Sequence, residues 1–238
     1  MREQRGFFKR KCFLYHGAAA VIIIGLILYE ALCLQGEHYY LISLAVMFTG
    51  IICGVLSFES GRPSTGLLIC ISVFTVTAVL SRLLLSPFPQ IKPIAAIVIL
   101  SGCCMGSEAG FMTGMLSMFL SNFYFMQGSW TPFQMFGMGL IGYFAGVLFF
   151  YKNADIKRTI LICVYGFISV IVLYGGIVDI NTMFFTMGGE PESTGVLTVY
   201  LAGLPFDLVF AVATVVVLAL LYRPVMRIWL RLSRKYEF

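Results

Sequence analysis

The sequence has little charge and lacks the motifs on which soluble nucleotide-binding enzymes depend. Of its 238 residues, 11% are charged and 60% are hydrophobic, whereas a soluble domain is about a quarter charged. It contains no GxxxxGK motif followed by Ser or Thr, which would cradle a phosphate, and its loops are too short for a nucleotide-binding fold. These absences exclude a soluble enzyme and predict an all-α, polytopic membrane protein.

Catalytic and metal-binding constellations are also missing. The two histidines, His16 and His38, have no assignable acid–base partner, and no Ser-His-Asp, Cys-His or paired-carboxylate arrangement appears. The seven cysteines lack metal-ligand spacing, and the adjacent Cys103 and Cys104 point to different faces of a helix. The sequence therefore predicts no catalytic residue, no metal site and no cofactor, and it disfavours an integral membrane enzyme.

The apolar runs predict about eight membrane-spanning helices, since one span needs about 20 apolar residues. The expected spans are residues 13–34, 39–58, 66–86, 93–107, 109–126, 133–151, 159–179 and 200–222. Gly106 to Glu108 would form the turn between the fourth and fifth spans. Residues 180–199 would form a long outer loop before the last span. Glycines at every fourth position from Gly102 to Gly114 predict close helix packing in the middle of the chain.

The net charge of +5 indicates orientation in a membrane and not nucleic-acid binding, because the basic residues stand beside apolar spans. Of the 16 Lys and Arg, 14 lie in the N-terminal head, at Arg62, in residues 152–158 and in the tail after residue 222. Only Arg82 and Lys92 fall in the opposite half. The positive-inside rule then predicts a cell-membrane protein whose two termini are both cytoplasmic.

Polar side chains inside the predicted spans are candidate functional residues, because ionisable groups are costly in a bilayer. Arg82, Asn122 and Asp207 should lie at similar depth in the outer half, and Asp179 at the outer end of its span. Two compatible interpretations follow. Arg82 and Asp207 could neutralise each other as an ion pair, or the group could line an outward-facing cavity that contacts a ligand.

The predicted outer turns suggest how such a cavity would be closed. Residues 87–92, 127–133 and 180–199 would form its lid, and the second of these turns combines Gln127 with Trp130. Trp130 could alternatively anchor its helix at the headgroup level. The candidate substrate-binding residues are Arg82, Asn122, Gln127, Trp130, Gln134, Asp179 and Asp207.

Several segments between about residues 66 and 236 carry a family resemblance. They are Ser81–Arg82, Lys92–Ala96, Gly106–Gly114, Ser121–Phe123, Trp130–Met135, Gly137–Gly146 and Gly203–Asp207. Together they resemble the substrate-binding S component of energy-coupling factor (ECF) transporters, and the branch associated with cobalamin uptake in particular. The string Trp-Thr-Pro-Phe-Gln-Met after Ser-Asn-Phe is the most specific of them.

The resemblance implies a six-helix substrate-binding core in residues 66–238, preceded by a basic anchor and two further spans in residues 1–65. It implies a vitamin-like organic substrate taken from the outer face, a membrane coupling subunit and two cytoplasmic ATPases as partners. The Ala-x-x-x-Ala motif of many relatives is absent from the third span, where Ser72 and Thr75 are the nearest small residues. A self-sufficient small-molecule permease is the alternative.

Overall fold

The computed structural model describes residues 22, 39–88, 90–150, 155–187 and 193–236, and every element within these ranges is helical. The elements are α2 (Tyr39–Ser60), α3 (Thr65–Leu84), α4 (Ile94–Met105), α5 (Ser107–Phe125), α6 (Thr131–Phe149), α7 (Ile156–Ser169), the π-helical segment η2 (Val170–Gly175), α8 (Gly176–Met187) and α9 (Ser193–Tyr236). The all-α prediction is confirmed. The first expected span, residues 13–34, lies outside the described residues except for Ile22.

Five helices in the described part of the chain are long and apolar enough to cross a membrane. They comprise residues 41–60, 65–84, 131–149, 156–183 and 197–235, and α4 is a shorter apolar helix. Each expected span from residue 39 onward coincides with a helix or, for residues 159–179, with the continuous α7–η2–α8 rod. The chain is therefore a multi-pass membrane protein, a helical bundle in which α2 packs against the α5–α6 pair.

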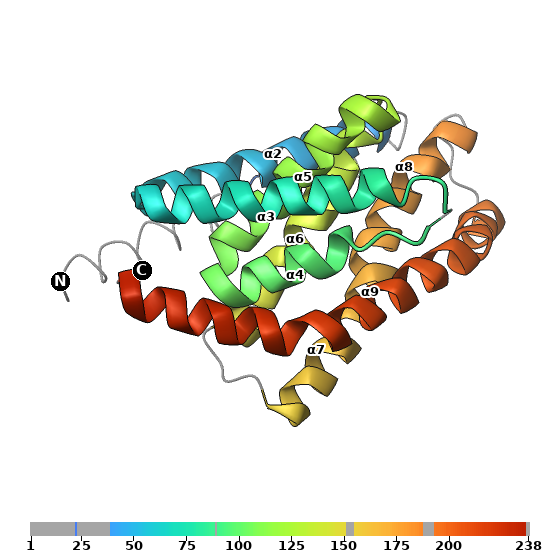
Figure 1. The fold of residues 1–238 in the computed structure, drawn as a ribbon. Helices are drawn as coiled ribbons and strands as arrows, with labels where there is room; N and C mark the ends of the chain where they lie inside the picture. Colours follow the sequence, from blue (N-terminus) through green and yellow to red (C-terminus); the bar gives the residue numbers. More distant parts are fainter. Residues whose placement is uncertain (1–21, 23–38, 89, 151–154, 188–192, 237–238) are drawn as a thin grey trace.

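Helix α4 forms the centre of the bundle, where it lies between α3 and α9 (Figure 1). All twelve of its residues are buried. Its sequence, IAAIVILSGCCM, is apolar almost all round, which is typical of a helix covered by neighbours on every side. The first residue, Ile94, lines the candidate site described below, so this site borders the buried centre of the bundle.

The periodic glycines bring α4, α5 and α6 into backbone contact, as the sequence predicted. A methyl group on Gly102 or Gly110 would overlap the carbonyl oxygen of Gly142 in α6, and one on Gly114 would overlap the carbonyl oxygen of Met138. Small residues allow helices to approach this closely, and dispersion contacts then hold them together. This packing holds the N-terminal half of α5, whose other end carries part of the candidate site.

The turn between α4 and α5 consists of Gly106 alone, which is shorter than the expected Gly106–Glu108 turn. Gly106 has φ 97°, a value that L side chains rarely adopt. A methyl group there would come no closer than 3.6 Å to Phe150. The backbone conformation, and not lack of space, therefore requires glycine at this position.

One expectation about the last third of the chain was wrong. The long outer loop at residues 180–199 is mostly helical, because α8 continues to Met187 and α9 begins at Ser193. The helix that contains the last expected span, residues 200–222, extends beyond it, since α9 runs for 44 residues to Tyr236. Buried Tyr222, Met226 and Trp229 continue its apolar face through the basic tail. At about 1.5 Å per residue, α9 is roughly twice as long as the bilayer core is thick.

Candidate ligand-binding site

A cavity of about 750 Å³ opens between the end of α3, the 85–93 connection, α8 and α9. The polar residues of its wall are Arg82, Gln90, Lys92, Gln134, Asp179, Thr182, Thr198 and Asp207. Large apolar and aromatic side chains complete it, namely Ile94, Met118, Tyr174, Val178, Val199, Phe206 and Phe210. Small-molecule sites typically enclose about 300–1,000 Å³ and combine apolar walls with a few fixed polar groups. The cavity has both properties.

Arg82 lies in the last turn of α3 and is only 6% exposed. Its Nη1 atom donates hydrogen bonds to Oγ of Ser121 and, at 2.8 Å, to Oδ1 of Asn122. Its guanidinium also lies over the ring of Phe125, 4.5 Å from the ring centroid. These contacts pin the end of α3 to the end of α5 and hold a positive charge at the cavity wall.

Asn122 connects Arg82 to α6. Its Nδ2 group donates to Oε1 of Gln134 at 2.8 Å and to Oγ1 of Thr131 at 3.3 Å. Thr131 in turn accepts a hydrogen bond from the backbone N–H of Gly128 at 3.1 Å. Because Asn122 is 1% exposed, it acts from behind the wall: it orients Arg82 and Gln134, which line the cavity. Three helices thus meet in one hydrogen-bonded network.

Lys92 supplies a second positive charge next to Arg82. Its Nζ lies 5.3 Å from the centroid of the Phe125 ring, which Arg82 also contacts. Lys92 stands in the connection before α4, and partial burial, together with the nearby Arg82 guanidinium, lowers the pKa of its ammonium group. The two cations make one side of the cavity strongly electropositive.

The opposite side carries two carboxylates, Asp179 of α8 and Asp207 of α9. Asp179 packs against Gly203 of α9, and Asp207 packs against Gly175 of η2. A methyl group on Gly203 would lie 3.0 Å from both carboxylate oxygens of Asp179, and one on Gly175 would overlap Oδ2 of Asp207. Both helices have the same Gly-x-x-x-Asp spacing, so antiparallel packing places each aspartate opposite a glycine. The glycines leave room for the carboxylates beside the cavity.

The π-helical segment η2 interrupts the long rod beside the cavity and ends at Gly175. Such segments widen a helical turn and frequently mark functional sites. Tyr174, within η2, lines the cavity and packs edge-on against Phe210, with ring centroids 5.5 Å apart. Aromatic side chains from η2 and α9 therefore share the cavity wall with the cations and the carboxylates.

The structure brings four of the seven candidate residues to the cavity wall, Arg82, Gln134, Asp179 and Asp207. Asn122 lies directly behind them. Gln127 and Trp130 do not line the cavity. Gln127 donates from Nε2 to the carbonyl oxygen of Phe119 at 2.9 Å, and Trp130 lies over Gly128 and is 37% exposed.

The expected ion pair between Arg82 and Asp207 is not formed. Both residues line the cavity, but no salt bridge joins them. The polar partners of Arg82 are Ser121 and Asn122, which belong to the neighbouring α5. The expectation rested on equal depth and opposite charge, and depth alone does not tell which way a side chain points around its helix.

Several wall residues were not among the candidate residues, notably Tyr174, Phe206 and Phe210, whereas Gln90 and Lys92 were expected only as part of the 87–92 lid turn. Lys92 could have been selected from the sequence, since it is one of only two basic residues that the charge distribution places on the outer side. Phe206 could also have been selected, because it adjoins the candidate residue Asp207. No sequence pattern marked Tyr174, whose position depends on η2. Across the part of the chain that is described, no group of three or more His, Cys, Asp or Glu could hold a metal ion.

Comparison with known proteins gives one match. The model of the family described as "ECF-type riboflavin transporter, S component" matches residues 64–227. No curated protein and no solved structure matches this chain. The matched range starts at the N-cap of α3, ends within α9 and contains the whole cavity wall. The matched family is the riboflavin one, so the expected likeness to the cobalamin branch has no support.

Proposed function

Because this chain belongs to the ECF-type riboflavin transporter S component family, we propose that it is the substrate-binding subunit of an ATP-driven vitamin importer. The observation that carries this proposal is the 750 Å³ cavity, which is walled by residues of the matched range and carries opposite charges on two sides. The chain would take its substrate from the outer face of the cell membrane.

We propose a flavin-sized vitamin, riboflavin in the first instance, as the substrate. Its flat ring system would pack against aromatic side chains such as Tyr174 and Phe210. Arg82 and Lys92 would donate hydrogen bonds to carbonyl oxygens of the ring, and Asp207 would accept them from hydroxyl groups of the sugar-alcohol chain. The cavity volume favours a ligand of ordinary drug size. A corrinoid is several times larger and would not be enclosed.

The proposed partners are a membrane coupling subunit and two cytoplasmic ATPases, which would supply the energy for uptake. We propose that both termini are cytoplasmic, since the basic residues gather in the head and in the tail. Residues 1–65 would add two spans to a six-helix core formed by residues 66–238. Under this proposal the isolated chain binds its substrate but does not transport it.

Binding and transport can be tested separately. Riboflavin is fluorescent, so titrating it with the purified chain should quench its emission, and Asp207→Asn should weaken that binding by tenfold or more. Vesicles that contain this chain alone should not accumulate riboflavin, whereas vesicles that also contain the coupling subunit and ATPases should do so with ATP. Absence of saturable riboflavin binding would refute the proposed substrate. Accumulation by the chain alone would favour a self-sufficient permease.

A further inference from the structure

A second hollow, of about 550 Å³, lies between α7 and α9, away from the charged cavity. Its walls are apolar and include Ile160, Val164 and Phe167 from α7 and Val215 and Ala219 from α9. Cys163, also in the wall, donates from Sγ to the carbonyl oxygen of Val215 at 3.8 Å and so joins the two helices. We call this hollow the α7–α9 groove.

One end of the α7–α9 groove is basic. Val215, Ala219 and Arg223 follow one another at four-residue intervals, so Arg223 continues the same face of α9 beyond the groove. On α7, Lys157 lies three residues before Ile160 and seven before Val164, again on the face that lines the groove. The antiparallel helices thus bring two positive charges to the same end of an apolar channel.

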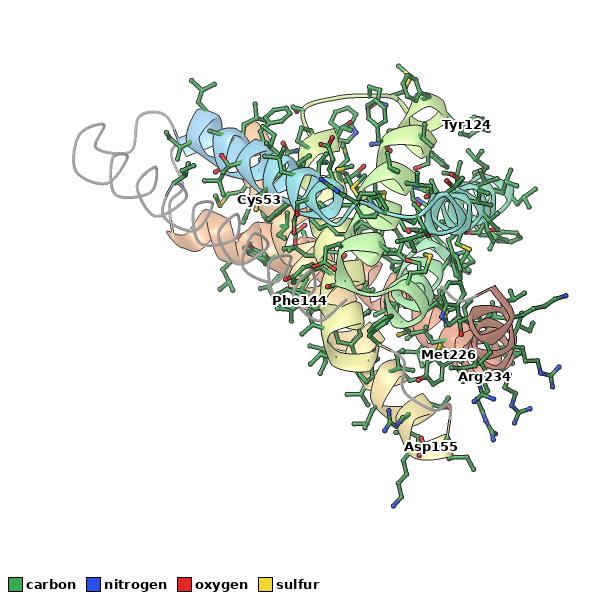
Figure 2. The ribbon with its side chains drawn as sticks, turned by 90° about the vertical axis from the view of Figure 1, so that its left-hand side faces the viewer. Cys53, Tyr124, Phe144, Asp155, Met226 and Arg234 are labelled. Atoms are coloured by element: carbon green, nitrogen blue, oxygen red, sulfur yellow. The ribbon has the colours of Figure 1, made fainter. Side chains whose placement is uncertain are left out.

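Among the described residues, neither Lys157 nor Arg223 forms a salt bridge. Asp155 is the acidic residue at the start of α7, and it already pairs with Arg158 at 3.8 Å. In Figure 2, Asp155 and the C-terminal part of α9, marked by Met226 and Arg234, lie in the same lower part of the view, with further basic side chains around them. Within the described ranges, the buried Nε atom of Arg223 has no hydrogen-bond partner. Buried N–H groups are normally hydrogen-bonded, so a ligand that supplies an acceptor would satisfy this donor.

From this arrangement we propose that the α7–α9 groove binds one anionic phospholipid. An acyl chain lies along the apolar wall, and the phosphate is bound by Lys157 and Arg223 at its basic end. The apolar channel requires an apolar ligand, and the charges at its end require an anionic group on that same ligand. Basic pockets between membrane helices bind anionic head groups for the same physical reason.

The test is native mass spectrometry of the purified full chain with added phosphatidylglycerol or phosphatidylcholine of identical acyl chains. The wild-type protein should retain one phosphatidylglycerol molecule in strong preference to phosphatidylcholine. Lys157→Gln and Arg223→Gln should each lower its retention by about tenfold, and Ala219→Phe should do so by filling the groove. Arg231→Gln, two turns further along α9, is the matched control and should retain the lipid.

Soluble glycerol phosphate distinguishes a lipid site from a phosphate site. It should not displace the lipid at equal concentration, because it lacks the acyl chain. Equal retention of the two lipids, displacement by glycerol phosphate, or full retention by both Lys157→Gln and Ala219→Phe would overturn the proposal. Lys157 and Ala219 are exposed, so these two variants should fold even if Arg223→Gln does not.

Discussion

The two halves of the bundle achieve contact in opposite ways. Helices α4, α5 and α6 meet backbone to backbone through Gly102, Gly110 and Gly142, with no space for a methyl group. The η2–α8 segment and α9 instead meet through glycines that face carboxylates, and a cavity of about 750 Å³ remains beside them. Among α4, α5 and α6, glycine therefore allows the backbones to touch. Beside α8 and α9, it leaves room for charged side chains. The first arrangement makes the helices pack closely, and the second leaves the cavity that we propose as the binding site.

We call α4–α6 the closed half and the α8–α9 region beside the cavity the open half. The largest effect on stability is expected when the helices of the closed half are forced apart. In Gly110→Ala, the new methyl group meets backbone atoms of Gly142 and Gly102, which cannot rotate away as a side chain could. We expect the free energy of unfolding to fall by about 3 kcal/mol, at the upper end of overpacking effects. Thermal unfolding in detergent measures it.

Gly176→Ala is the matched control for this change. A methyl group on Gly176 would have no neighbour within 4 Å, and alanine in a helix is about 0.5–1 kcal/mol more favourable than glycine. The control should therefore melt at the same temperature as the wild type or slightly higher. If both variants lost stability equally, the contrast between the two halves would not depend on backbone contact.

Asn122→Ala should have the next largest effect, because it removes the hydrogen bonds by which α5 holds Arg82 of α3 and Gln134 of α6 at the cavity wall. Arg82 and Gln134 would both lose a hydrogen bond, and leaving buried polar groups unpaired costs about 1–3 kcal/mol. Substrate affinity should fall by about tenfold, even though Asn122 does not line the cavity. Gln127→Ala, which removes an exposed hydrogen bond, should leave melting temperature and affinity unchanged. Similar losses in the two variants would show that the network does not position the site.

Gly175→Ala tests the open half and should separate binding from stability. The methyl group would overlap Oδ2 of Asp207, which lies at the end of a side chain that can turn away. We therefore expect a change in unfolding free energy of less than about 1 kcal/mol, within the range of ordinary substitutions. Affinity should nevertheless fall by about tenfold, because Asp207 is displaced from the cavity wall. Unchanged affinity would mean that the position of this carboxylate does not matter for binding.

The closed half was largely predictable from the sequence, whereas the open half was not. Four-residue glycine spacing from Gly102 to Gly114 has one simple structural consequence, close packing, and the structure contains it. The cavity depends on features without a local signature. No local sequence pattern marks the π-helical turn at Tyr174, and the pairing of Gly175 with Asp207 joins residues on different helices.

The C-terminal helix shows a second limit of prediction from composition. The charges after residue 222 suggested that the last span ends there, because charged segments usually lie outside the bilayer. Tyr222, Met226 and Trp229 are nevertheless buried, at spacings of four and three residues, so α9 continues along the bundle as an amphipathic helix. The spacing of these apolar residues, and not the number of charges, is therefore the better guide to the continuation of the helix past residue 222.

Trp130→Ala should have the smallest effect on affinity. It tests most directly whether the proposed binding site extends to the 127–133 turn. The side chain lies over Gly128 at the turn before α6, is 37% exposed and does not line the cavity. We expect affinity to change by less than about threefold, which corresponds to less than about 0.7 kcal/mol, whereas Tyr174→Ala should weaken binding by more than tenfold because that ring is part of the wall. Equilibrium titration of riboflavin fluorescence against both variants measures the difference. A loss in Trp130→Ala as large as that in Tyr174→Ala would extend the site to the 127–133 turn and give that turn the lid role that the sequence first suggested.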